Sequence, residues 1–103
     1  MAQLDGIWEV KRLSGALPPL VGMRKRIYGT RGETLLGPIR MPFDVRGNEL
    51  HYRAPFSRFV DVIDVGENVC QGRATFNGKQ FGRFALRRAQ MAKEEKTEER
   101  IAV

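Results

Sequence analysis

A regular succession of short strand-like segments, separated by turn residues, is the feature that most constrains this chain. Asn77-Gly78 is the strongest turn signal, because both central residues of a type I′ hairpin turn need a positive φ. Gly-Pro at 37–38 is a further break, and Gly-Asn at 47–48 is a second hairpin signal. No amphipathic-helix period occurs before residue 88. The pattern predicts an all-β fold: a meander of seven or eight short antiparallel strands, closed as an up-and-down barrel.

The strand expected at residues 39–46 has the cleanest alternation, and its predicted inward set is Ile39, Met41, Phe43 and Val45. Residues 56–65 are read as one strand with apolar residues on both faces, which predicts a β-bulge. The proline-containing loop 17–22 is expected to cross one end of the sheet as a lid or plug. The other strands are expected at residues 7–13, 23–29, 33–36, 50–53, 69–76 and 79–88.

A closed barrel requires its first and last strands to pair. The first predicted strand begins with Gly6-Ile7-Trp8, which holds the only tryptophan, and the last ends with Arg87-Arg88. A Gly-x-Trp opening with an arginine at the end of the final strand resembles the calycin superfamily, meaning lipocalins, fatty-acid-binding proteins and their bacterial relatives. The resemblance implies a lipocalin-like β-barrel domain over residues 1–88. It also implies that Arg88, or failing that Arg87, packs across Trp8 and seals one end of the barrel.

The interior of such a barrel is expected to be apolar and aromatic. We predict that it binds an apolar or amphipathic small molecule, as the resemblance implies. The expected ligand-binding residues are Trp8, Met41, Phe43, Tyr52, Phe84 and Arg88. The alternative is that these side chains simply fill the core, as side chains do in small barrels.

A basic surface is the second candidate site. The chain carries 18 Lys and Arg against 12 Asp and Glu, which gives a net charge of +6. The densest basic cluster is Arg24, Lys25 and Arg26, and Tyr28 lies nearby. Basic and aromatic side chains together are typical of sites that bind single-stranded nucleic acids. We predict anion binding at these three residues, with a basic module for nucleic acid or another anionic partner as the alternative function. The competing interpretation is a solvated face that only aids solubility.

Residues that commonly carry chemistry are sparse and scattered. His51 and Cys70 are single and far apart, without the spacing of a zinc site. Asp61 and Asp64 lie three apart on one predicted strand, so they should point to opposite faces and form no carboxylate pair. No phosphate-binding glycine loop or dinucleotide fingerprint occurs. We therefore expect a binding protein that is not an enzyme, with no catalytic residue, metal or cofactor.

The remaining expectations concern the tail, the compartment and the assembly. Residues 89–103 are rich in helix formers and charge pairs, which predicts a short charged helix or tail. One cysteine, no apolar run near ~20 residues and no basic-then-apolar start predict a cytoplasmic protein without a membrane span. Apolar residues such as Ile7, Val60 and Val62 should face outward on a short barrel, and we therefore expect a homodimer.

Overall fold

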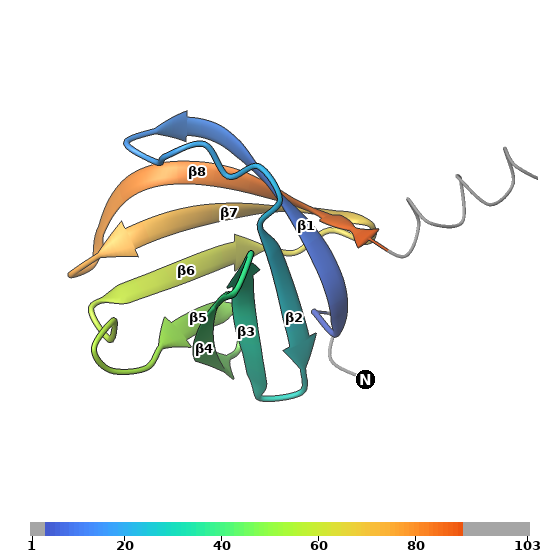
Figure 1. Ribbon diagram of the computed structural model, residues 1–103, viewed down its shortest axis with the longest axis horizontal. Coiled ribbons are helices and arrows are strands. Elements are labelled where there is room, and N and C mark those ends of the chain that lie inside the picture. Colours follow the sequence, from blue (N-terminus) through green and yellow to red (C-terminus); the bar gives the residue numbers. More distant parts are fainter. Residues whose placement is uncertain (1–3, 90–103) are drawn as a thin grey trace, which may run out of the picture.

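The computed structural model describes residues 4–89, and it shows a closed antiparallel barrel of eight strands (Figure 1). Each strand pairs with the next in the chain, and β8 returns to pair with β1. The predicted all-β class and meander are therefore confirmed. The strands are β1 (Gly6–Gly15), β2 (Arg24–Tyr28), β3 (Arg31–Leu36), β4 (Ile39–Arg46), β5 (Glu49–Tyr52), β6 (Phe59–Asp64), β7 (Val69–Phe76) and β8 (Lys79–Arg88).

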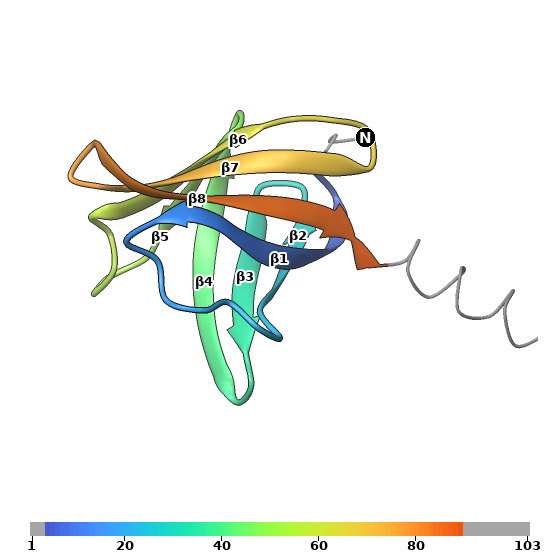
Figure 2. The same cartoon turned by 90° about the horizontal axis from the view of Figure 1, so that it is seen from above.

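Pairing between β1 and β8 closes the barrel, and the two strands lie side by side in both views (Figure 1 and Figure 2). Trp8 lies opposite Arg88 and Val10 opposite Leu86, so the two ends of the domain share one register. The register shifts between Arg12 and Ser14, which marks a β-bulge. Closure leaves neither terminal strand of the barrel as an open edge.

The turn prediction at residues 77–78 is confirmed. Asn77 has φ of 50° and Gly78 has φ of 79°, the left-handed pair that a type I′ turn needs. At Gly72 a glycine is required for space rather than for a positive φ. A Cβ at Gly72 would lie 2.2 Å from the ring of Phe84, so the glycine lets this phenylalanine fill the interior.

The bulge predicted within residues 56–65 is wrong. Strand β6 begins only at Phe59, and its pairing with β5 and β7 runs without a shift. Alternation is regular along β6, because Asp61 and Ile63 are buried while Val60 and Val62 are only half-buried. A polar residue occupies an inward position, and this is what made the apolar pattern look mixed. A second bulge lies instead where β7 pairs with β8, between residues 74 and 75.

Buried apolar side chains fill one end of the barrel. The largest side chains that are less than 2% exposed include Trp8, Phe43, Ile27, Leu50, Ile63 and Leu86. Ile39, predicted to face inward, is 55% exposed because it begins β4 directly after the hairpin turn at 37–38. Met41 and Val45 are partly buried. The core thus occupies less of β4 than the alternation alone suggested.

The predicted seal over Trp8 is confirmed. Trp8 has no exposed surface, and the Arg88 guanidinium carbon lies 4.2 Å from the centroid of its ring. Trp8 Nε1 donates to the Leu4 carbonyl at 2.9 Å, and Arg88 Nη1 donates to the Asp5 carbonyl at 2.8 Å. The arginine therefore combines a cation–π contact with a tie to the backbone before β1, which closes this end of the barrel.

The predicted plug, loop 17–22, is present only in part. Leu20 is buried and Leu17 packs against the core, but Val21 points outward and is 87% exposed. Within the described part of the chain, no helix is long and apolar enough to cross a membrane. Apart from Ala89, the charged segment predicted at 89–103 lies outside the described residues.

Candidate functional site

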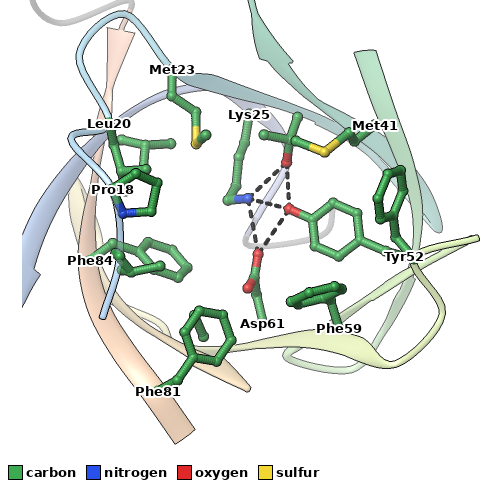
Figure 3. A pocket seen from close by; sticks show the side chains of 15 residues that line it. Pro18, Leu20, Met23, Lys25, Met41, Tyr52, Phe59, Asp61, Phe81 and Phe84 are labelled. Carbon is green, nitrogen blue, oxygen red and sulfur yellow. Dashed lines mark hydrogen bonds and ion pairs between the residues drawn. The ribbon is translucent and has the colours of Figure 1, made fainter. Parts of the chain in front are cut away.

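A largely apolar pocket of about 290 Å³ lies inside the barrel (Figure 3). Trp8 and Arg88, which form the seal, do not line it. Loop 17–20 and the aromatic residues of β6 and β8 surround it. Its apolar lining includes Leu17, Leu20, Met41, Phe59, Phe81 and Phe84. Ala74 also lines it, and this small residue of β7 leaves space that a larger side chain would fill.

Four polar side chains from four strands meet at one wall of this pocket (Figure 3). The ammonium of Lys25 (β2) lies 2.8 Å from Thr34 Oγ1 (β3), 2.7 Å from the Tyr52 hydroxyl (β5) and 3.0 Å from Asp61 Oδ2 (β6). Tyr52 also lies 2.6 Å from Thr34 and 3.0 Å from Asp61 Oδ2. We call Lys25, Thr34, Tyr52 and Asp61 the polar cluster.

The polar cluster lies between the pocket and the sealed core. Lys25 is opposite Trp8 in the register of β1 and β2. Its Nζ is 5.7 Å from the centroid of Phe43, a core residue that does not line the pocket, and 5.4 Å from that of Phe84, which does. The cluster therefore forms the inner wall of the pocket, and aromatic faces surround its cation.

Strand alternation explains why Lys25 is inside. Ile27 is fully buried, and Lys25 lies two residues before it on the same strand face. Asp61 has the same relation to Ile63 on β6. Lys25 is 2% exposed and Asp61 7%, so neither charge would be stable there without the other. The shared parity with Ile27 and Ile63 was a sequence signal that could have revealed both residues.

The ion pair is held in its charged form. Burial by itself would lower the pKa of Lys25, but the Asp61 carboxylate, together with Tyr52, outweighs burial and places this pKa above its usual range. Burial raises the pKa of Tyr52, partly opposed by the nearby Lys25 ammonium, so the phenol keeps its proton. At neutral pH the cluster therefore holds one cation, one anion and two neutral hydroxyl groups.

The structure divides the six residues predicted to bind ligand. Met41, Tyr52 and Phe84 line the pocket together. Trp8, Phe43 and Arg88 do not line it; they belong to the sealed end, where Phe43 meets the Tyr52 ring edge-on at 5.5 Å. Half of the set thus surrounds the pocket, and the other half supports its inner wall.

The predicted anion-binding surface of Arg24, Lys25 and Arg26 is corrected at Lys25, which points into the barrel because the strand alternates. Arg24 and Arg26 do lie on the outer face. Each has an acidic neighbour, since Arg24 lies 3.9 Å from Glu9 and Arg26 lies 3.9 Å from Glu33. The outer face is therefore less cationic at this point than three consecutive basic residues suggested.

The other reactive side chains are separate from the pocket. Cys70 is buried and its thiol contacts Gly66, while His51 lies 2.9 Å from Glu49. Among the residues that the structure describes, no three His, Cys, Asp or Glu side chains come together in a way that could hold a metal ion.

The fold and site define a class of protein: a closed eight-stranded antiparallel barrel with an internal, largely apolar pocket and a buried ion pair on its wall. Comparison of the chain with protein-family models, with curated proteins and with solved structures found no match.

Proposed function

We propose that the protein binds an amphipathic small molecule inside its barrel and catalyses no reaction on it. The observation that carries this proposal is an apolar pocket whose only strongly polar lining, among the described residues, is the cluster on its inner wall. Such a pocket suits a ligand with an apolar body and one polar group. The pocket of about 290 Å³ lies at the small end of the range for ligand sites, so the ligand is compact.

A binding role of the calycin kind also agrees with the way the barrel ends differ. The Trp8–Arg88 stack closes one end, while the pocket lies toward the other end, under loop 17–20. The apolar side chains around the pocket, including Phe56 at 44% exposure, offer an apolar entrance.

The state of Lys25 favours binding over catalysis. A lysine acts as a nucleophile or base only when it loses its proton, which burial can promote. Here burial, which lowers the pKa of Lys25, is outweighed by Asp61 and Tyr52 together, so the pKa is raised and the ammonium keeps its proton. The group is thus suited to hold neighbouring oxygens in place.

The alternative function, a basic module for nucleic acid, has weaker support. Because Lys25 is buried, the central cation of the predicted basic surface cannot contact a partner outside the barrel. Arg24 and Arg26 would then have to bind phosphate in competition with Glu9 and Glu33. Binding to single-stranded DNA or RNA that weakens steeply with salt, while apolar ligands fail to bind, would support this alternative instead.

We also propose that the protein forms a homodimer and is located in the cytoplasm. Val60 and Val62 alternate outward on β6 and are half-buried, and they would form part of a homodimer face. The single buried Cys70 agrees with a reducing compartment such as the cytoplasm.

Titration with the neutral apolar fluorophore Nile red tests the proposed function. We expect saturable, nearly salt-independent binding to the native protein. Ala74→Phe would fill the pocket and abolish this binding, whereas Arg73→Phe, on the exposed face of the same strand, should leave it intact. Unchanged binding by a folded Ala74→Phe variant would refute the pocket as the binding site.

A further inference from the structure

The hydrogen bonds of the polar cluster determine which ligand group it can accept. An ammonium has three N–H donors. Lys25 Nζ has three acceptors within 3.0 Å, namely Thr34 Oγ1, the Tyr52 hydroxyl and Asp61 Oδ2. Its donors are therefore fully used, and an incoming acceptor would have to break one of these bonds.

The two hydroxyl groups are also used as donors. The Tyr52 hydroxyl has one proton, which it donates to Asp61 Oδ2. Because an ionised carboxylate cannot donate, the 2.6 Å contact between Tyr52 and Thr34 must be a bond that Thr34 donates. The hydrogen bonds thus point in one direction: Thr34 donates to Tyr52, and Tyr52 donates to Asp61. No donor of the polar cluster is left for a ligand.

The unused capacity of the cluster lies at Asp61. Its Oδ2 accepts bonds from Lys25 and Tyr52, but within residues 4–89 its Oδ1 accepts none. Asp61 lines the pocket, and Figure 3 shows its second oxygen turned away from the other three side chains. A carboxylate oxygen with free lone pairs in an otherwise apolar pocket can accept a hydrogen bond from a ligand donor.

The charge balance further limits that donor. Lys25 already neutralises Asp61 at 3.0 Å, so the cluster as a whole carries no net charge. A carboxylate ligand would place an anion against the free oxygen of Asp61. An ammonium ligand would add a second, uncompensated cation close to Lys25 in an apolar interior.

We propose that the pocket selects ligands whose polar group is a neutral hydrogen-bond donor, an alcohol or a primary amide, which bonds to Asp61 Oδ1. This inference rests on the proposed function, because it concerns the ligand of the same pocket. It predicts that fatty-acid carboxylates are poor ligands here. The apolar body of the ligand lies against Met41, Phe59 and Phe84.

Displacement of Nile red by matched eight-carbon compounds tests the inference. 1-Octanol and its isomer 1-methoxyheptane have the same formula, but only the alcohol can donate a hydrogen bond. We expect the alcohol to compete about tenfold better or more, since the ether leaves the Asp61 oxygen desolvated and unpaired. Octanamide should resemble the alcohol, and octanoate and octylammonium should both compete less well than the alcohol.

A double variant ties the preference to the polar cluster. Lys25→Met combined with Asp61→Leu replaces the buried ion pair by apolar side chains, which protein cores often tolerate. In this variant the alcohol should lose its advantage over the ether while Nile red still binds. Asp64→Leu removes an exposed carboxylate from the same strand and should preserve the advantage.

The possible outcomes separate this inference from the proposed function. If Nile red fails to bind the native protein, the proposed function fails, and this inference fails with it. If Nile red binds but the ether, octanoate or octylammonium competes as well as the alcohol, only the selectivity is overturned. Persistence of the alcohol preference in the folded double variant would likewise overturn the role of Asp61.

Discussion

Lys25 Nζ and Asp61 Oδ2 lie 3.0 Å apart inside the barrel, although the two residues are 36 positions apart in the chain and their strands are not neighbours in the sheet. The pair connects β2 with β6 across the interior. The same two residues therefore stabilise the barrel and provide the charged part of the pocket lining.

Single substitutions in the ion pair should be far more damaging than replacement of the pair. Lys25→Met leaves a buried carboxylate, and Asp61→Leu leaves a buried ammonium, so each should lower the free energy of unfolding by about 3–5 kcal/mol. The double variant should lie within about 2 kcal/mol of the native protein. Urea unfolding of all four proteins measures this coupling, and additive losses would contradict it.

Stability should fall steeply in alkaline solution. The pKa values of Lys25 and Tyr52 are both raised by folding, so above about pH 10 the unfolded chain releases protons that the folded protein retains. The folded state then binds more protons, and the free energy of unfolding decreases as pH rises. Each group lowers the free energy of unfolding by at most about 1.4 kcal/mol per pH unit. Below about pH 9 neither group makes the free energy of unfolding depend on pH.

Urea midpoints between pH 8 and 11 measure this slope. Tyr52→Phe should make the slope shallower, whereas Tyr28→Phe, at a tyrosine that is 60% exposed, should leave it unchanged. Equal slopes in the native protein and in Tyr52→Phe would show that the Tyr52 phenol is not protected by folding.

The seal over Trp8 should be visible in fluorescence and in stability. A tryptophan with no exposed surface should emit at short wavelength and resist quenching by iodide. Trp8→Ala should cost about 3–5 kcal/mol, as large truncations in a core do. Arg88→Met should cost less and make the emission more accessible to quencher, while Arg73→Met on the outside of β7 should change neither. A readily quenched native tryptophan would contradict the seal.

The proposed homodimer predicts a concentration-dependent mass. Sedimentation at micromolar concentration should show a species of about twice the 11.7 kDa chain mass. Val60→Lys or Val62→Lys would place a charge on the outer face of β6 and should shift the equilibrium to the monomer, whereas Gln71→Lys on the exposed face of β7 should not. A single species near 11.7 kDa at every concentration would rule the dimer out.

Much of the barrel was predictable because strand period and turn chemistry act locally. The meander and the Asn77-Gly78 turn follow from residue patterns that can be recognised along the chain. The stack of Arg88 on Trp8 was expected only from the resemblance to the calycin superfamily. The errors arose where a local pattern was incomplete. The polar Asp61 at an inward position of β6 led to the wrong prediction of a bulge. Three consecutive basic residues led to the wrong prediction that Lys25 lies on the surface.

The sequence by itself determined the strands, the turns and which residues share a face, since these depend on neighbours a few positions apart. Period 2 alone places Lys25 on the face of Ile27 and Asp61 on the face of Ile63. Only the tertiary structure decided that these two faces meet, because their separation depends on the number, tilt and register of all the strands that close the barrel. The ion pair, the donor count around it and the pocket that it borders are consequences of that closure.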